Sequence, residues 1–180
     1  MRTFIAIEIP EKIRAEIFHI FEKINGTNLI SGNFVEKDNL HLTLKFLGEL
    51  TGEQLQKVKE KISEINFSKF DLETDGIGFF PNENYIRVMW VGLKGAKLLQ
   101  LQKIIEDKVY EVGIRKDDKA FSSHLTVARI KNIKNKTLFL EKIKNLRIKE
   151  ESFSVKNFSL FKSELIENET RYKKIQDFSL

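Results

Sequence analysis

The chain has 180 residues, with 31 Lys and Arg against 26 Asp and Glu, which gives a formal net charge of +5. A hydrophobic share of 41% with a charged share of 32% is typical of a folded soluble protein and excludes an intrinsically disordered one. Because cysteine is absent, a disulfide framework, a cysteine-ligated zinc site and a cysteine nucleophile are all excluded.

The first part of the chain is predicted to alternate strands and helices. A strand over residues 2–9 precedes a helix that Pro10 opens, since proline favours the first helical position, and that Gly26 ends. A loop through 31–33 then leads to a strand that begins near Asn39. The next helix begins with a capping box between Thr51 and Gln54. Its predicted buried stripe is Leu55, Val58, Ile62 and Ile65.

The rest of the chain predicts more strands than helices. Turn residues at 81–84 separate two strands, and so short a connection requires an antiparallel pair. The predicted elements that follow 51–65 are strands at 70–80 and 85–93, a helix at 97–112, a basic loop at 115–119, a strand at 124–130, a helix at 136–146 and strands at 153–162 and 171–178. The order β-α-β-α-β-β-α-β-α-β-β predicts an α+β fold with mixed or antiparallel sheets.

The N-terminal segment favours a cytoplasmic protein. Residues 1–10 place Glu8 where the apolar core of a signal peptide should continue, and no cleavage pattern follows. No apolar run approaches the roughly 18–20 residues that a membrane-spanning helix needs. We therefore expect no membrane association.

Two of the three histidines lie in matching sequence contexts. Residues 41–44 are His-Leu-Thr-Leu and residues 124–127 are His-Leu-Thr-Val, and the two histidines are 83 positions apart. The third, His19, lies inside the first predicted helix and is expected to be an ordinary surface or partly buried residue. The recurrence indicates a duplicated unit.

Strand geometry places each histidine beside a threonine. Side chains alternate between the two faces of a strand, so His41, Thr43 and Lys45 should share one face. In the second copy, His124 and Thr126 should share a face. The apolar residues between them need a core, so each His-Thr pair must face a cleft or solvent. If a pseudo-twofold axis relates the two copies, both pairs converge on one cleft.

This set of side chains suits an in-line displacement at phosphorus. Imidazole titrates near pH 6.5, so one histidine can act as base while the other acts as acid. Threonine hydroxyls can donate to phosphate oxygens, and Lys45 or Arg129 can balance the charge. No Asp or Glu cluster at metal-ligand spacing accompanies the histidines, so we expect no metal. A serine hydrolase is disfavoured, and Ser122 and Ser123 are expected to shape the entry to the strand.

Both motifs resemble the paired His-x-Thr-x motifs of the two-histidine (2H) phosphoesterase superfamily. Residues 2–7, 39–48 and 158–163, with Arg171 and Tyr172, further resemble the RNA 2',3'-cyclic phosphodiesterase family, also called 2'-5' RNA ligase. The resemblance implies one bilobal α+β domain over 1–180, with two pseudo-twofold-related lobes, helices outside and a central cleft. It also implies hydrolysis of RNA 2',3'-cyclic phosphate ends to 2'-phosphates, 2'-5' ligation of tRNA halves in vitro, and no metal or nucleotide cofactor.

The resemblance implies roles for six residues. His41 matches the proton donor to the leaving 3' oxygen, and His124 matches the proton acceptor that activates water. Positions that contact the phosphate or the nucleotide are matched by Thr43, Thr126, Arg129 and Phe46. Strict alternation places Phe46 and Arg129 on the core side, so the strands must bulge or end before them, or these two assignments fail. A buried unpaired guanidinium would be costly, which favours the cleft for Arg129.

Two alternative functions stay open on the same residues. One is a small-molecule cyclic phosphodiesterase, acting on nucleoside 2',3'-cyclic phosphates or an ADP-ribose cyclic ester. The other is a non-catalytic RNA-end binding module, although binding alone needs no acid and base. The expected partner is RNA, with no obligate protein partner and a monomeric chain. Other basic residues should form solvated faces unless several line the cleft, where they would hold RNA phosphates: Lys131, Lys134, Lys136, Lys142, Lys144 and Arg147.

Overall fold

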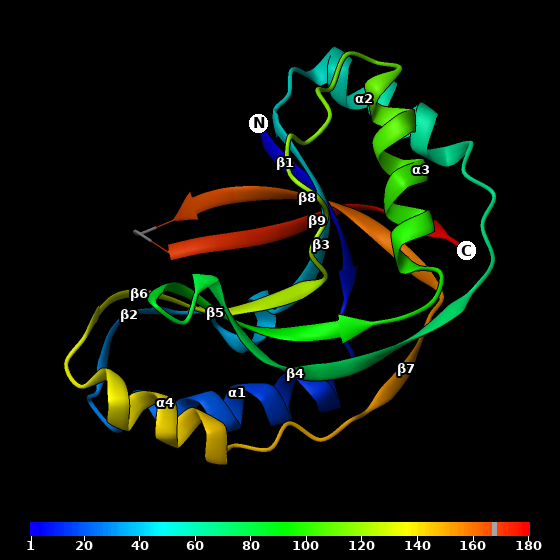
Figure 1. Ribbon diagram of the computed structural model, residues 1–180. Coiled ribbons are helices and arrows are strands. Elements are labelled where there is room, and N and C mark those ends of the chain that lie inside the picture. Colours follow the sequence, from blue (N-terminus) through cyan, green and yellow to red (C-terminus); the bar gives the residue numbers. More distant parts are fainter. Residues whose placement is uncertain (167–168) are drawn as a thin grey trace.

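The computed structural model describes residues 1–166 and 169–180, which form two antiparallel sheets with helices packed outside them (Figure 1). The first sheet contains β1 (Arg2–Glu8), β3 (His41–Glu49), β8 (Asn157–Ile166) and β9 (Glu169–Ser179). The second contains β2 (Ile30–Phe34), β4 (Phe70–Asn82), β5 (Tyr85–Lys94), β6 (His124–Ile133) and β7 (Ser152–Val155). Their strand orders are β3-β1-β8-β9 and β2-β6-β5-β4-β7. The predicted α+β fold with two lobes is confirmed.

The helices pack in two pairs. Helices α1 (Glu11–Asn25) and α4 (Lys136–Asn145) lie against the second sheet, while α2 (Gly52–Ser63) packs on α3 (Leu98–Tyr110) beside the first (Figure 1). A short 3-10 turn at Lys37–Asn39 leads into β3. None of the helices within 1–166 and 169–180 is both long enough and apolar enough to cross a membrane.

Helical periodicity and capping explain why these segments form helices. Apolar residues three or four positions apart bury one face of α1, and burial of each such side chain contributes about 1.5–3 kcal/mol. The buried residues of α1 are Ile13, Ile17, Phe21 and Ile24. At the start of α2, the Gln54 amide donates to Thr51 Oγ1 at 3.2 Å, and the Thr51 amide donates to Gln54 Oε1 at 3.0 Å. The predicted capping box is therefore confirmed.

Two predicted boundaries are wrong. Residues 30–34 form the strand β2 rather than a loop, and Gly32 is needed there because a Cβ would lie 2.1 Å from the Arg129 carbonyl oxygen. The strand predicted at 153–162 is two strands, because β7 joins the second sheet and β8 joins the first. The chain thus crosses between the lobes at Lys156, a step that the apolar pattern does not reveal.

Candidate active site

The two motif strands lie next to each other where the sheets meet. Both β3 and β6 begin at their histidine, and both histidines are partly buried. β3 is the edge strand of the first sheet, whereas β2 and β5 flank β6 in the second. The structure therefore brings together the two segments that the sequence singled out, one from each lobe.

A β-bulge interrupts each motif strand three residues after its histidine. In β3, Lys45 pairs with Ile5 and Thr43 with Ala6, so Leu44 has no partner in β1. The same shift recurs in β6, where residues 126 and 128 pair with consecutive residues of β5 and 127 has no partner in β5. A bulge adds one residue to a strand and so reverses the alternation of faces beyond it.

The bulges turn the fifth residue after each histidine toward the histidine's face. Phe46 is 63% exposed, and its ring centroid lies 6.1 Å from that of Phe4, which in turn lies 4.9 Å from the ring of His41. Arg129 is exposed, while its neighbours on both sides are buried. The conflict between alternation and the implied cleft positions of Phe46 and Arg129 is thereby resolved.

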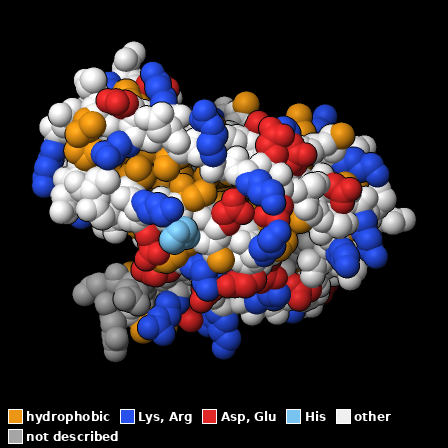
Figure 2. All heavy atoms as spheres, turned by 90° about the horizontal axis from the view of Figure 1, so that it is seen from below, with side chains coloured by type: hydrophobic (Ala, Val, Ile, Leu, Met, Phe, Trp, Pro, Cys, Tyr) orange, Lys and Arg blue, Asp and Glu red, His pale blue; other side chains and the backbone are white. Residues whose placement is uncertain are grey.

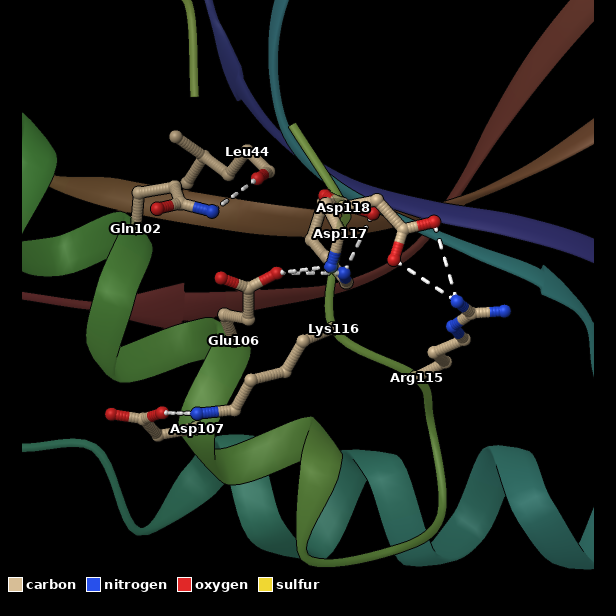
Figure 3. A network of polar contacts seen from close by, with 9 residues as sticks. Leu44, Gln102, Glu106, Asp107, Arg115, Lys116, Asp117 and Asp118 are labelled. Carbon is tan, nitrogen blue, oxygen red and sulfur yellow. Dashed lines mark hydrogen bonds and ion pairs between the residues drawn. The ribbon is translucent and has the colours of Figure 1, made fainter. Parts of the chain in front are cut away.

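The prediction that Lys45 shares the cleft face with His41 is wrong, because the bulge sends Lys45 to the opposite side. Its side chain is 0% exposed, and its Nζ lies 2.9 Å from Glu106 Oε1 on α3 and 2.8 Å from Asp117 Oδ1. Glu106 Oε1 also accepts a hydrogen bond from the Asp117 amide at 2.8 Å (Figure 3). Lys45 is therefore unavailable to balance the charge of a bound phosphate.

Each histidine is oriented by a carbonyl two residues before it. His41 Nδ1 lies 2.7 Å from the Asn39 carbonyl oxygen, and His124 Nδ1 lies 2.8 Å from that of Ser122. A carbonyl can only accept, so Nδ1 must carry the hydrogen in both rings. Nε2 is then the atom that gains or loses a proton, which is the arrangement that a general acid or base needs.

Aromatic rings hold both imidazoles in place. The His41 ring lies between Phe4, at a centroid distance of 4.9 Å, and Tyr172, edge-on at 5.0 Å. The His124 ring meets Phe80 edge-on at 4.9 Å and Trp90 at 6.2 Å. Such contacts fix the ring plane and exclude water from its faces. The two histidine motifs alone do not reveal these four aromatic neighbours, because the rings come from four different strands.

Burial lowers the pKa of both histidines. Desolvation lowers the pKa of His41, the Asn39 carbonyl partly offsets this, and the charge on His124 adds to the lowering. Desolvation also lowers the pKa of His124, with a further contribution from Arg129. Because the charge of His124 contributes to lowering the pKa of His41, the second motif is electrostatically coupled to the first.

Each motif threonine shares the partly buried face of its strand with the histidine. Thr43 and Thr126 are partly buried, and their hydroxyls have no hydrogen-bond partner within residues 1–166 and 169–180.

A cavity of about 190 Å³ opens beside His41. It is lined by Phe4, Glu8, Ile9, Arg14, Asp38, Leu40, His41, Phe161, Tyr172 and Lys174. Ion pairs close its rim, with Lys174 Nζ 2.5 Å from Glu8 Oε2 and Arg14 3.3 Å from Asp38 Oδ1.

His19 lies on the exposed face of α1, away from both motif strands. In the part of the chain that the structure describes, no three His, Asp or Glu side chains come together as a metal site would require.

Comparison with known proteins identifies the family of this chain. The family described as LigT like Phosphoesterase matches the chain twice, over residues 7–90 and 91–172, so each match contains one motif. An RNA 2',3'-cyclic phosphodiesterase of Methanocaldococcus jannaschii is 37% identical over 183 residues, which cover 99% of this chain and 100% of that protein.

Solved structures agree with the sequence comparison. Escherichia coli LigT complexed with 3'-AMP superposes with a TM-score of 0.79 at 27% identity, covering 99% of this chain and 97% of that one. A Thermus thermophilus protein superposes with a TM-score of 0.81 at 28% identity, covering 100% and 98%. The chain therefore belongs to the LigT-like phosphoesterases, a family of two-histidine phosphoesterases.

Proposed function

We propose that this chain hydrolyses the 2',3'-cyclic phosphate end of RNA to a 2'-phosphate by acid–base catalysis between His41 and His124, without a metal ion. One observation carries the proposal: both imidazoles have Nδ1 engaged by a carbonyl, which leaves both Nε2 atoms for proton transfer. The relatives named RNA 2',3'-cyclic phosphodiesterase supply the substrate class, and the LigT structure with 3'-AMP supports a nucleotide in the cleft.

Each chemical step has a side chain to perform it. Neutral His124 takes a proton from water at Nε2, and the water oxygen forms a bond to phosphorus. The bond from phosphorus to the 3' oxygen breaks, and protonated His41 gives its Nε2 proton to that oxygen. The product keeps the phosphate on the 2' oxygen. If a 5'-hydroxyl takes the place of water, the same steps form a 2'-5' bond, which is the ligation expected in vitro.

The remaining predicted residues bind the substrate. Thr43 and Thr126 donate hydrogen bonds to the non-bridging phosphate oxygens, where negative charge grows in the transition state. Arg129 supplies the cation that Lys45 cannot supply. Phe46, exposed on the same side, offers an aromatic face for the terminal base.

The test is the turnover of a short RNA that ends in a 2',3'-cyclic phosphate, measured with excess EDTA. We expect complete conversion to the 2'-phosphate at the rate seen without EDTA. A rate lost with EDTA and restored by a divalent ion would contradict the metal-independent mechanism. Hydrolysis of mononucleotides alone would favour a small-molecule phosphodiesterase, and tight binding without turnover would favour an RNA-end binding module.

A further inference from the structure

The positive charge of the chain is concentrated in one segment. Residues 119–149 contain nine Lys and Arg and one acidic residue, Glu141, which is a net charge of +8. The rest of the chain contains 22 Lys and Arg against 25 Asp and Glu, a net charge of −3. The segment comprises β6, with the second histidine motif, and the helix α4 that follows it.

Three lysines that follow Arg129 along the chain are exposed to solvent. Lys131 on β6, Lys134 in the following turn and Lys136 at the start of α4 are all exposed. Within residues 1–166 and 169–180, none of these three lysines forms an ion pair, whereas Lys12 and Lys37 each pair with a glutamate. Their charges are therefore not neutralised within the chain.

An exposed aromatic residue accompanies these lysines. Tyr85 is 55% exposed, and the Arg87 guanidinium stacks over its ring at 4.5 Å. Arg87 also donates to the Lys131 carbonyl oxygen at 3.3 Å, and Lys136 Nζ donates to the Asn84 carbonyl oxygen at 3.0 Å. The first of these hydrogen bonds joins β5 to β6, and the second joins the start of α4 to the turn that precedes β5. Basic side chains combined with an open aromatic face are the features that bind single-stranded nucleic acid.

Basic and acidic side chains are mixed on the face that carries this segment (Figure 2). Figure 2 looks onto the face that carries α1 and α4, and it shows the surface indented on the left. Lys and Arg side chains lie across this whole face, including the lobe above the indentation, and acidic side chains gather mainly near its middle (Figure 2). The nearby Glu83 lines a separate cavity of about 170 Å³ beneath α4 together with Lys144.

We propose that Tyr85, Arg87, Lys131, Lys134 and Lys136, which we call the β6 track, bind the RNA strand upstream of the cyclic phosphate. This inference rests on the proposed function, because it takes the terminal phosphate to lie beside Arg129. From there the strand runs along β6 toward the start of α4. The lysines contact successive phosphates, and Tyr85 stacks on a base. The track makes the enzyme selective for an oligonucleotide over a mononucleotide.

The experiment compares two substrates and two triple variants. The track variant carries Lys131→Gln, Lys134→Gln and Lys136→Gln. The control carries Lys23→Gln, Lys69→Gln and Lys103→Gln, which remove the same charge from exposed lysines that form no ion pair within 1–166 and 169–180. For each protein, kcat/KM is measured against salt concentration on a nucleoside 2',3'-cyclic phosphate and on an oligoribonucleotide with the same end.

The track variant should lose activity on the oligonucleotide alone. At low salt we expect kcat/KM on it to fall on the order of tenfold, and the slope of log kcat/KM against log salt to shrink by about 2, since each phosphate contact on a single strand contributes about 0.7. Activity on the mononucleotide should stay unchanged, and the control should match the wild type on both substrates. An equal loss in the control, or an unchanged oligonucleotide rate in the track variant, would overturn the proposal.

A binding measurement separates this proposal from the proposed function. The dissociation constant of an oligoribonucleotide ending in a 2'-phosphate is measured for the same three proteins. If the wild type hydrolyses neither substrate, the proposed function fails, but weaker binding by the track variant alone would still support the β6 track. Equal binding by all three proteins would overturn it.

Discussion

Lys45 Nζ lies 2.8 Å from Asp117 Oδ1, and this contact joins the strand of the first histidine to the loop that leads into the strand of the second. Glu106 on α3 completes the set by accepting from both Lys45 and the Asp117 amide (Figure 3). Gln102, also on α3, donates to the carbonyl oxygen of the bulged Leu44 at 3.5 Å. Helix α3 thus ties β3 to the loop that precedes β6, on the side of β3 opposite His41.

Lys45→Met should destabilise the protein and loosen the site. Methionine keeps much of the packing volume but leaves Glu106 and Asp117 without their cation, and such a loss costs about 1–3 kcal/mol. We expect a lower midpoint in urea, and a kcat that falls more than KM changes, because the two histidines lose their relative position. Lys57→Met, at an exposed ion pair on α2, is the control and should change neither quantity. Unchanged stability in Lys45→Met would show that the buried lysine contributes nothing.

The sequence predicted most of the helices and both motifs, because apolar periodicity and capping residues are local signals. It did not predict the bulges at Leu44 and Val127, since a bulge depends on the partner strand. For that reason the face of Lys45 was predicted wrongly. The strand β2 was not predicted, because Ser31, Gly32 and Asn33 are residue types that favour a turn. The reason for a glycine in this strand is its close contact with β6.

The pH dependence of kcat/KM should show a maximum on the acidic side of pH 6.5. Catalysis needs one neutral and one protonated imidazole, so the rate rises through the lower pKa and falls through the higher one. Burial holds the pKa of both His41 and His124 below the ordinary value of 6.5, so the maximum of the free enzyme lies below that pH. The anionic substrate favours the charged imidazole, so the kcat maximum should lie at a higher pH.

Arg129→Gln tests whether the titration of His124 produces one limb of that pH profile. Removing the cation relieves its repulsion of protonated His124, so one limb of the kcat/KM profile should move to higher pH. The measurement is the pair of profiles for the wild type and this variant, with the chemical step shown to limit the rate. A wild-type profile that rises across the imidazole range without a maximum would argue against a histidine acid.

Thr43→Val and Thr126→Val should each lower the rate without lowering stability. Valine keeps the shape of the strand but removes a donor to the phosphate, and such a donor contributes about 10²–10³ in rate. Neither hydroxyl has a partner in the described part of the chain, so thermal unfolding should be unaffected.

Thr74→Val is the matched control for these two variants. The Thr74 hydroxyl donates to the Lys149 carbonyl oxygen at 2.7 Å and accepts from the Glu151 amide at 3.0 Å, outside the cleft. Its removal should lower the melting temperature and leave kcat/KM unchanged. Wild-type turnover by the double variant of Thr43 and Thr126 would remove both residues from the site.

The central claim is that His41 acts as the acid and His124 as the base, and the dependence on the leaving group tests it most directly. Removing either histidine should cost roughly 10²–10⁴ in rate on an RNA cyclic phosphate, whose leaving group is a ribose alkoxide. A phosphodiester with a nitrophenolate leaving group needs no acid. Under single-turnover conditions, His41→Ala should therefore regain most of its activity on the nitrophenyl substrate, while His124→Ala should not, because water still needs a base. Recovery of His124→Ala alone would reverse the two roles, and recovery of neither would contradict the acid–base account.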